Sequence, residues 1–190
     1  MNNLKKITNL IYEAAVVARL KRTGWQILGD NEESLGEHIF MTAVIAYILG
    51  RQLKVNLEKV LVMAVFHDFH EGRVGEIDKI ALRYITRDIA KANRDIFTEV
   101  EPKLVSLLSE YEAKKTREAQ VVYEANIIAL LVELKQLVEK GNIHAQEWLE
   151  ANSKRLKLPA AINLAQTLTK TSSQDWWKDI RADLHREFAK

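Results

Sequence analysis

The chain has 190 residues and a mass of 21.8 kDa, enough for one sizeable hydrophobic core, so we expect a single domain. Its 7 Gly and 2 Pro are too few for the frequent turns of a β-sandwich or barrel, and no glycine-rich phosphate loop occurs. The absence of Cys excludes disulfides, Cys-ligated zinc, iron–sulfur clusters and thiol nucleophiles, and 28 basic against 26 acidic residues (net +2) argue against nucleic acid as a main partner.

Helical periodicity begins near the N-terminus. Apolar residues at three- and four-residue spacing predict a first helix over residues 4–18, followed by a connection over residues 19–31. Ser34 and Glu37 have the spacing of a capping box, in which the side chain of each residue accepts a hydrogen bond from the backbone amide of the other. This pattern predicts a second helix that ends near Leu53.

A third helix is expected over residues 57–71, with Asn56 as its N-cap and Gly72 as its end. It is apolar nearly all round, so we expect it at the buried centre of the bundle. Further helices are expected over residues 81–98 (one or two helices), 102–141 (with a break near Lys114), 144–152, 159–170 and 174–189. With no repeat or linker, the prediction is one compact all-α domain over residues 1–190. Trp176 and Trp177 are expected in its core, with a position at an interface as the alternative.

The chain shows no pattern of a targeting or membrane segment. Its N-terminus leads directly into an amphipathic pattern, and its longest apolar runs fall far short of the roughly 18 residues of a membrane span. We therefore expect a cytoplasmic protein without a membrane partner.

The apolar third helix ends in a polar segment, residues 67–71 (HDFHE). Charged groups there are costly to remove from water, and a divalent cation would compensate that cost. His67 and Glu71 are four residues apart, so they should share one side of a helix. The alternative for an isolated histidine is a hydrogen-bonded structural role, and we keep that interpretation for His144 and His185.

Three motifs in order resemble a known family. Residues 33–38 (ESLGEH), 67–71 (HDFHE) and 75–77 (GEI) look like the HD-domain metal-dependent phosphohydrolases, most of all their 5′-deoxynucleotidase branch, with its E-S-x-x-E-H, H-D-x-x-E and G-D-[IL] patterns. The resemblance covers about residues 4–150 and implies an all-α HD-type domain. Residues 151–190 match no motif, and we expect them to form a helical C-terminal extension.

The resemblance implies a metal site. It makes His38, His67 and Asp68 metal ligands and lets Glu71 orient or deprotonate the attacking water. The family prefers transition metals such as cobalt or manganese, and a site of nitrogen and oxygen ligands is compatible with these.

The resemblance also implies substrate contacts. Arg22 and Trp25 resemble the arginine and tryptophan that precede the first metal histidine in the branch, so Arg22 would hold the phosphate and Trp25 would line the sugar pocket. Glu76 would lie near the sugar, where the family usually has Asp, and the extra methylene moves its carboxylate. The alternatives are that Arg22 is a solvated cation and that Trp25 is a core aromatic.

The fourth ligand of the family, an Asp on a later helix, is missing. Counting back 15 residues from the helix end at Gly141, as the family's spacing suggests, gives Asn126, and no Asp occurs between Asp95 and Asp175. Glu124 is about 200° away around a helix and should point elsewhere. Asn126 offers an oxygen without charge, so we expect weakened metal binding and softened or lost hydrolysis. Ordinary hydrogen bonding by Asn126 is the alternative.

The leading interpretation is a metal-dependent phosphomonoesterase that acts on a small nucleotide, a (deoxy)nucleoside 5′-monophosphate. A second interpretation is a nucleotide- or metal-binding HD-like domain that has lost turnover through Asn126 and Glu76. A third is a helical interaction module whose His-Asp pair is only a buried hydrogen bond. Relatives of the branch resemble dimers, so a homodimer is expected.

Overall fold

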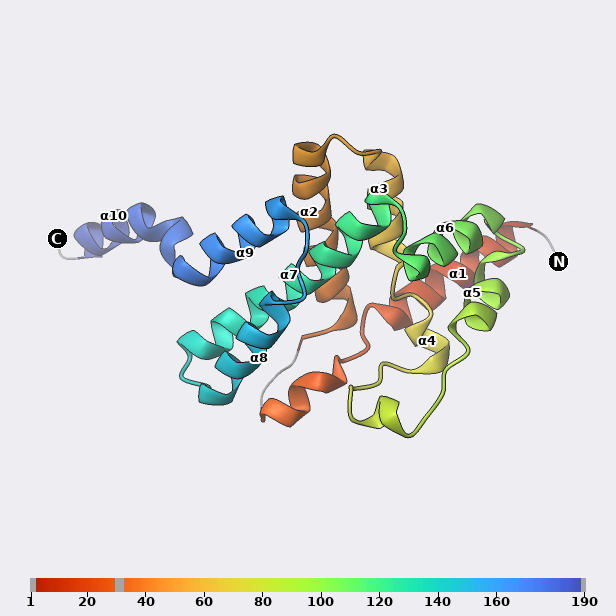
Figure 1. The fold of residues 1–190 in the computed structure, drawn as a ribbon, viewed down its shortest axis with the longest axis horizontal. Coiled ribbons are helices and arrows are strands. Elements are labelled where there is room, and N and C mark those ends of the chain that lie inside the picture. The colour runs from red at the N-terminus through yellow and green to blue at the C-terminus, as the bar shows by residue number, and fades with distance from the viewer. Residues whose placement is uncertain (1–2, 30–32, 189–190) are drawn as a thin grey trace.

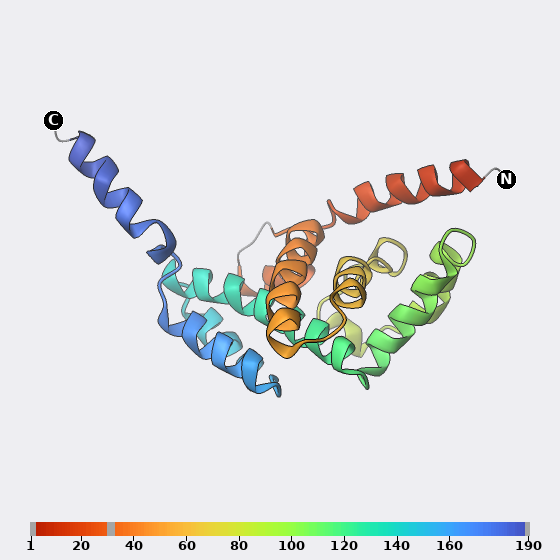
Figure 2. The same cartoon turned by 90° about the horizontal axis from the view of Figure 1, so that it is seen from above.

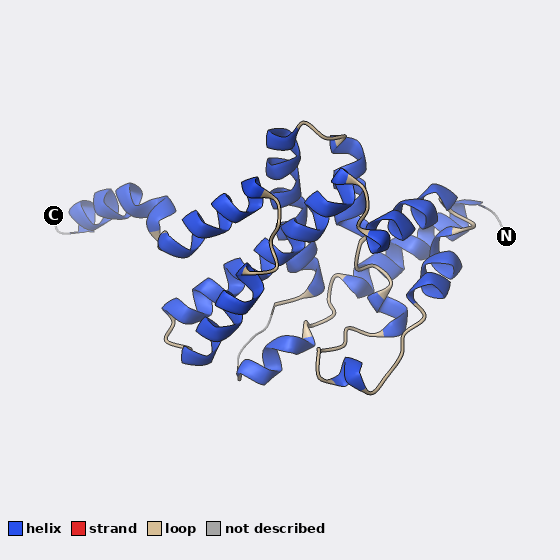
Figure 3. Cartoon of the chain, in the orientation of Figure 1, coloured by secondary structure: helices blue, strands red, loops and turns tan. Residues whose placement is uncertain are grey.

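The computed structural model describes residues 3–29 and 33–188 (Figure 1). These two ranges consist of helices and connecting loops without a strand, which confirms the expected all-α class (Figure 3). The α-helices are, in chain order, α1 (Asn3–Val17), α2 (Leu35–Leu53), α3 (Leu57–Phe66), α4 (Glu71–Val74), α5 (Ile89–Phe97), α6 (Pro102–Ala113), α7 (Arg117–Glu139), α8 (Ile143–Ser153), α9 (Pro159–Lys170) and α10 (Lys178–Phe188). Short 3-10 helices are η1 (Thr23–Leu28), η2 (Ala81–Arg83) and η3 (Asp175–Trp177).

The central helix is α7, which packs against α2, α3, α6, α8 and α9 and runs through the middle of the molecule in Figure 1. Small buried residues along it, Ala119, Ala125 and Ala129, let its neighbours approach closely. By contrast, α3 leaves Val65 43% exposed. The expectation that the third helix forms the centre is therefore wrong. An apolar composition does not decide which helix is surrounded, and α7 is longer and contacts more neighbours.

The third helix also ends earlier than the sequence predicts. α3 stops at Phe66, and the chain turns through residues 67–70 with hydrogen bonds to the third residue back, from Phe69 N to Phe66 O and from Glu71 N to Asp68 O. Gly72 lies inside the short helix α4 instead of ending a longer one. A side chain at Gly72 would meet Val17 of α1 at 2.8 Å, so this glycine serves packing.

The break between α6 and α7 is confirmed at Lys114, which has a left-handed backbone with φ of 53°. Glu124 of α7 is buried and points away from Asn126, as expected. Its carboxylate accepts hydrogen bonds from the backbone amides of Lys157 at 3.0 Å and Leu158 at 2.9 Å. These bonds hold the start of the C-terminal segment against α7, where α9 then packs on α2 and α7.

The two terminal helices extend outward from the helical body. Figure 2 shows α1 and α10 projecting on opposite sides. Trp176 is 81% exposed and contacts Trp177, so the expected core position of Trp176 is wrong. Among residues 3–29 and 33–188, none of the helices has both the length and the apolar character needed to cross a lipid bilayer.

The entry into α2 is pinned to the segment that follows α1. The backbone amide of Arg22 donates to Glu33 O at 3.1 Å, and that of Gly36 donates to Ala18 O at 3.2 Å. The capping box of Ser34 is present, as predicted. A Cβ on Gly36 would lie 2.8 Å from the carbonyl oxygen of Ala18, so this close backbone approach requires glycine.

We predict that Gly36→Ala lowers the free energy of unfolding by about 1–3 kcal/mol, because the added methyl group forces two backbone segments apart. Gly24→Ala is the matched control, since a Cβ there meets no heavy atom within 4 Å. Urea unfolding of both variants measures the difference. Equal stability of the two variants would contradict the packing role of Gly36.

Candidate functional site

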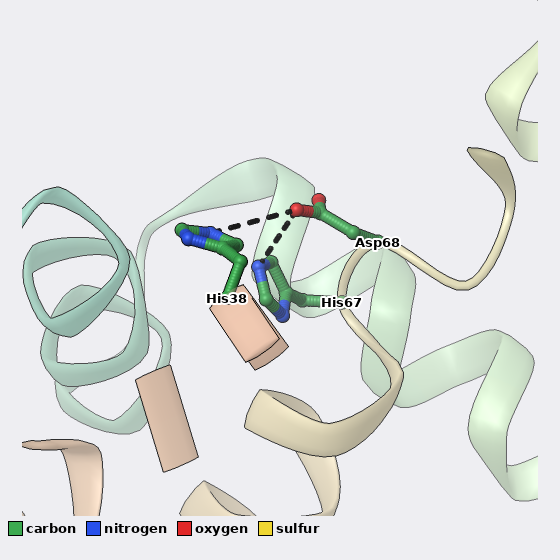
Figure 4. Close-up of side chains that lie close together, drawn as sticks. All are labelled: His38, His67 and Asp68. Carbon is green, nitrogen blue, oxygen red and sulfur yellow. Dashed lines mark ion pairs between the residues drawn. The ribbon is translucent and has the colours of Figure 1, made fainter. Parts of the chain in front are cut away.

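Four of the predicted site residues meet at one point, from three parts of the fold. His38 comes from α2, His67 and Asp68 from the turn after α3, and Asn126 from α7. Asp68 Oδ2 lies 3.0 Å from His67 Nε2 and 3.9 Å from His38 Nε2 (Figure 4). Asn126 Oδ1 lies 3.1 Å from His38 Nε2. The geometry therefore brings together the three predicted ligands and Asn126, the residue predicted at the fourth position.

The contacts of the two Nδ1 atoms leave the Nε2 atoms of both imidazoles facing this point. His67 Nδ1 donates to the carbonyl oxygen of Ala64 at 2.8 Å, so the neutral ring has its lone pair on Nε2. His38 Nδ1 faces Glu33 Oε1 at 3.7 Å. Both rings are fully buried. With their Nε2 atoms unprotonated, the imidazoles and the oxygens of Asp68 and Asn126 present converging lone pairs, so the residues fit a divalent metal ion.

The charges of the cluster keep Asp68 ionised. Burial alone would raise the pKa of this carboxyl. The nearby side chains of His67, His38 and Arg22 outweigh burial and hold the pKa far below its ordinary value. Burial and the nearby Arg22 lower the pKa of His38, which favours the neutral ring that a metal requires. Burial also disfavours a charged His67, but its contact with Asp68 outweighs this and raises its pKa.

Glu71 and Glu76 form a second group of carboxyls beside Asp68. Burial, the charge of Asp68 and a hydrogen bond to Glu76 raise the pKa of Glu71 to about 11. At neutral pH Glu71 therefore carries a proton in the absence of a cation. Arg87 Nη1 lies 3.7 Å from Glu71 Oε1 and donates to the carbonyl oxygen of Gly75 at 2.9 Å. Sequence reasoning missed Arg87, because it lies in a loop without a pattern or motif.

Glu33 organises the wall of the site. Its Oε2 accepts a hydrogen bond from Trp25 Nε1 at 2.6 Å and lies 3.3 Å from Arg22 Nε. Arg22 Nη1 in turn lies 3.9 Å from Asp68 Oδ2. Sequence reasoning treated Glu33 only as part of a motif, although that motif was the signal that could have identified it. Trp25 is only 2% exposed, so it serves the core as well as the site.

A cavity of about 310 Å³ opens over this cluster, a size suited to a small ligand. Six predicted site residues line it: Arg22, Trp25, Asp68, Glu71, Glu76 and Asn126. His38 and His67 do not line the cavity themselves, but both contact Asp68, which does. A second cavity of about 420 Å³ lies between α7, α8 and α9, but its lining contains neither His nor Asp.

The chain is similar to several known proteins. A family model described as HD domain matches residues 17–169, a range that includes α8 and almost all of α9. The 5′-deoxynucleotidase HDDC2 of Xenopus laevis is 28% identical over 163 residues, covering 79% of each chain. A 5′-deoxynucleotidase of Vibrio vulnificus is 28% identical over 147 residues, covering 67% of this chain and 75% of the relative.

A solved structure shares the fold. A conserved hypothetical protein from Pyrococcus furiosus superposes with a TM-score of 0.76 at 26% identity, covering 86% of this chain and 99% of that one. Together with the family match, these relatives confirm the resemblance to HD-domain metal-dependent phosphohydrolases of the 5′-deoxynucleotidase branch.

We predict that Asn126→Asp tightens the binding of Co²⁺ or Mn²⁺ by about tenfold or more, because a carboxylate adds the negative charge that this ligand position lacks. Calorimetric titration of the metal-free protein measures the affinity. Asn163→Asp on the exposed side of α9 adds the same charge away from the cluster and should leave the affinity unchanged. Equal affinities of the native protein and Asn126→Asp would contradict a ligand position at residue 126.

Proposed function

Because the chain belongs to the HD domain family, we propose that it is a metal-dependent phosphohydrolase that cleaves a small phosphomonoester, a (deoxy)nucleoside 5′-monophosphate. The observation that carries this proposal is the convergence of donor atoms from His38, His67, Asp68 and Asn126 beside a cavity with Arg22 in its wall. The names of the similar enzymes from Xenopus laevis and Vibrio vulnificus support the nucleotide substrate.

These four residues would hold the metal ion through two imidazole nitrogens, one carboxylate oxygen and one amide oxygen. A divalent cation bound there would polarise the phosphate and lower the pKa of a water molecule. Nitrogen and oxygen ligands without sulfur suit cobalt or manganese among the transition metals.

Arg22 would bind the phosphate. Its Nε is held by Glu33, while its Nη1 reaches toward Asp68 across 3.9 Å and lines the cavity. That separation is too long for a strong hydrogen bond, so the guanidinium can donate its hydrogen bonds to a phosphate oxygen of the substrate. Because Glu33 also accepts a hydrogen bond from Trp25 Nε1, the same carboxylate positions both the arginine and the tryptophan.

Glu71 would orient the attacking water and accept its proton. Its raised pKa comes from burial and from the negative charge of Asp68, so compensation of that charge by a cation lowers the pKa and frees the carboxylate. The neighbouring Glu76 can share the proton through the hydrogen bond between the two side chains. As the water oxygen bonds to phosphorus and the ester bond breaks, this pair can return a proton to the leaving 5′ oxygen.

Glu76 also faces the expected place of the sugar. It lines the cavity, and its carbonyl oxygen lies 3.4 Å from the Thr23 hydroxyl of η1. The family's Asp would have a shorter side chain, so Glu76 leaves less room for the sugar. We therefore expect Glu76 to influence the choice between ribose and deoxyribose.

A second function is a domain that binds metal and nucleotide without turnover. The uncharged amide of Asn126 at the fourth ligand position favours it, because the ligand set carries only the single charge of Asp68. Homodimer formation and a cytoplasmic location stay predictions from the sequence.

We predict that the protein loaded with Co²⁺ or Mn²⁺ releases inorganic phosphate from a panel of deoxyribonucleoside and ribonucleoside 5′-monophosphates. Asp68→Asn should abolish release, since it removes the only charged ligand. A colorimetric phosphate assay after chelator treatment and reloading measures both. Metal and nucleotide binding without release from any substrate would instead support the binding domain.

We predict that Arg22→Ala reduces kcat/KM by roughly 10²-fold, because it removes a cation that stabilises charge on the phosphate. Arg19→Ala is the control, since Arg19 belongs to the same basic run but is exposed. It should retain native kinetics. Native kcat/KM for Arg22→Ala would contradict a phosphate-binding role.

A further inference from the structure

Tyr111 of α6 touches two members of the cluster. Its hydroxyl oxygen accepts a hydrogen bond from Asn126 Nδ2 at 3.2 Å. Its ring packs edge-on against the His67 imidazole, with centroids 5.5 Å apart and planes at 72°. The side chain is only 5% exposed, so these contacts are enclosed. Sequence reasoning gave Tyr111 no role, because it falls on the apolar face of an ordinary amphipathic helix.

In this structure the Tyr111 hydroxyl accepts a hydrogen bond from the NH₂ end of the Asn126 amide, and the oxygen end faces the cluster. The two ends of an Asn side chain have nearly the same shape, but only the oxygen has a lone pair for a cation. Asn126 presents Oδ1 to His38 Nε2 and Nδ2 to the Tyr111 hydroxyl. Turned over, the amide would direct two N–H groups toward the place of a cation and would bring its oxygen against Tyr111.

An aspartate would not need this arrangement. Both of its carboxylate oxygens can bind a cation, and its charge draws it to the site in either orientation. An asparagine has no such charge, so a hydrogen bond of its NH₂ group contributes more to its orientation. Groups that orient metal ligands in this way strongly influence metal affinity.

We propose that Tyr111 is a positioning residue that holds the amide oxygen of Asn126 toward the metal site and thereby replaces part of what the missing aspartate would supply. This inference rests on the metal site of the proposed function. It adds a residue to the site that acts through Asn126, and it makes Tyr111 and Asn126 one functional pair.

The experiment is a double-mutant cycle that measures the Co²⁺ affinity of the native protein, Tyr111→Phe, Asn126→Asp and the double variant by calorimetry. Tyr111→Phe keeps the ring against His67 and removes only the hydroxyl. In the native background it should weaken binding roughly 10- to 100-fold, the range for lost orienting partners. In the Asn126→Asp background the loss should be less than about threefold, because a carboxylate needs no orientation.

Tyr123→Phe is the matched control. Tyr123 lies one turn before Asn126 on α7 and lines the same cavity, but its hydroxyl accepts a hydrogen bond from Arg155 instead of Asn126. It should bind Co²⁺ with native affinity. An unchanged affinity of Tyr111→Phe, or an equal loss in both backgrounds, would overturn the inference, since equal losses indicate packing alone.

A second measurement needs no change at Tyr111. In the nitrogen-15 NMR spectrum of the Zn²⁺-loaded native protein, the Asn126 side-chain NH₂ signal, identified by its absence from Asn126→Asp, should exchange slowly with solvent. Rapid exchange would overturn the inference even if Tyr111→Phe does not fold. Failure of the native protein to bind any divalent cation would overturn the proposed function together with this inference, whereas native binding with an indifferent Tyr111→Phe would overturn this inference alone.

Discussion

An ionised carboxylate among buried imidazoles is the interaction on which this site depends. Removing a charge from water is costly unless positive charge or hydrogen bonds surround it. Asp68 meets His67 at 3.0 Å, and His38 and Arg22 each at 3.9 Å. Each of these partners comes from a different part of the fold. Their contacts with the Asp68 carboxylate therefore connect α2, the turn after α3 and the segment after α1. A divalent cation would complete it.

The turn after α3 is what makes this arrangement possible. Had α3 continued to Glu71, its regular geometry would have distributed residues 67–71 around a cylinder. The early end at Phe66 instead lets His67 point back into the core while Asp68, His70 and Glu71 line the cavity. The pairing of residues 18–22 with residues 33–36 then brings Arg22 and Glu33 to the same point. Two local backbone features therefore create the site.

Asn126 brings an oxygen to the cluster but adds no charge. Its Oδ1 stands where a ligand oxygen is expected, but the ligand set carries a single negative charge. Such a site depends more on orientation and less on Coulomb attraction, and the Tyr111 hydroxyl is placed to supply orientation. The carboxyl of Glu71 lies outside this set and responds to its charge, because burial and the charge of Asp68 raise its pKa.

The sequence by itself determined the helical class, the caps at Ser34 and Asn56, the break at Lys114 and the identity of the residues that converge at the site. These features depend on local spacing and on short motifs, which remain visible in one dimension. Only the tertiary structure decided that α7 is the central helix, that α3 ends at Phe66, and that Glu33, Arg87 and Tyr111 belong to the site. Those outcomes depend on contacts between residues far apart in the chain, and no local pattern encodes which side chain a buried hydroxyl or guanidinium will meet.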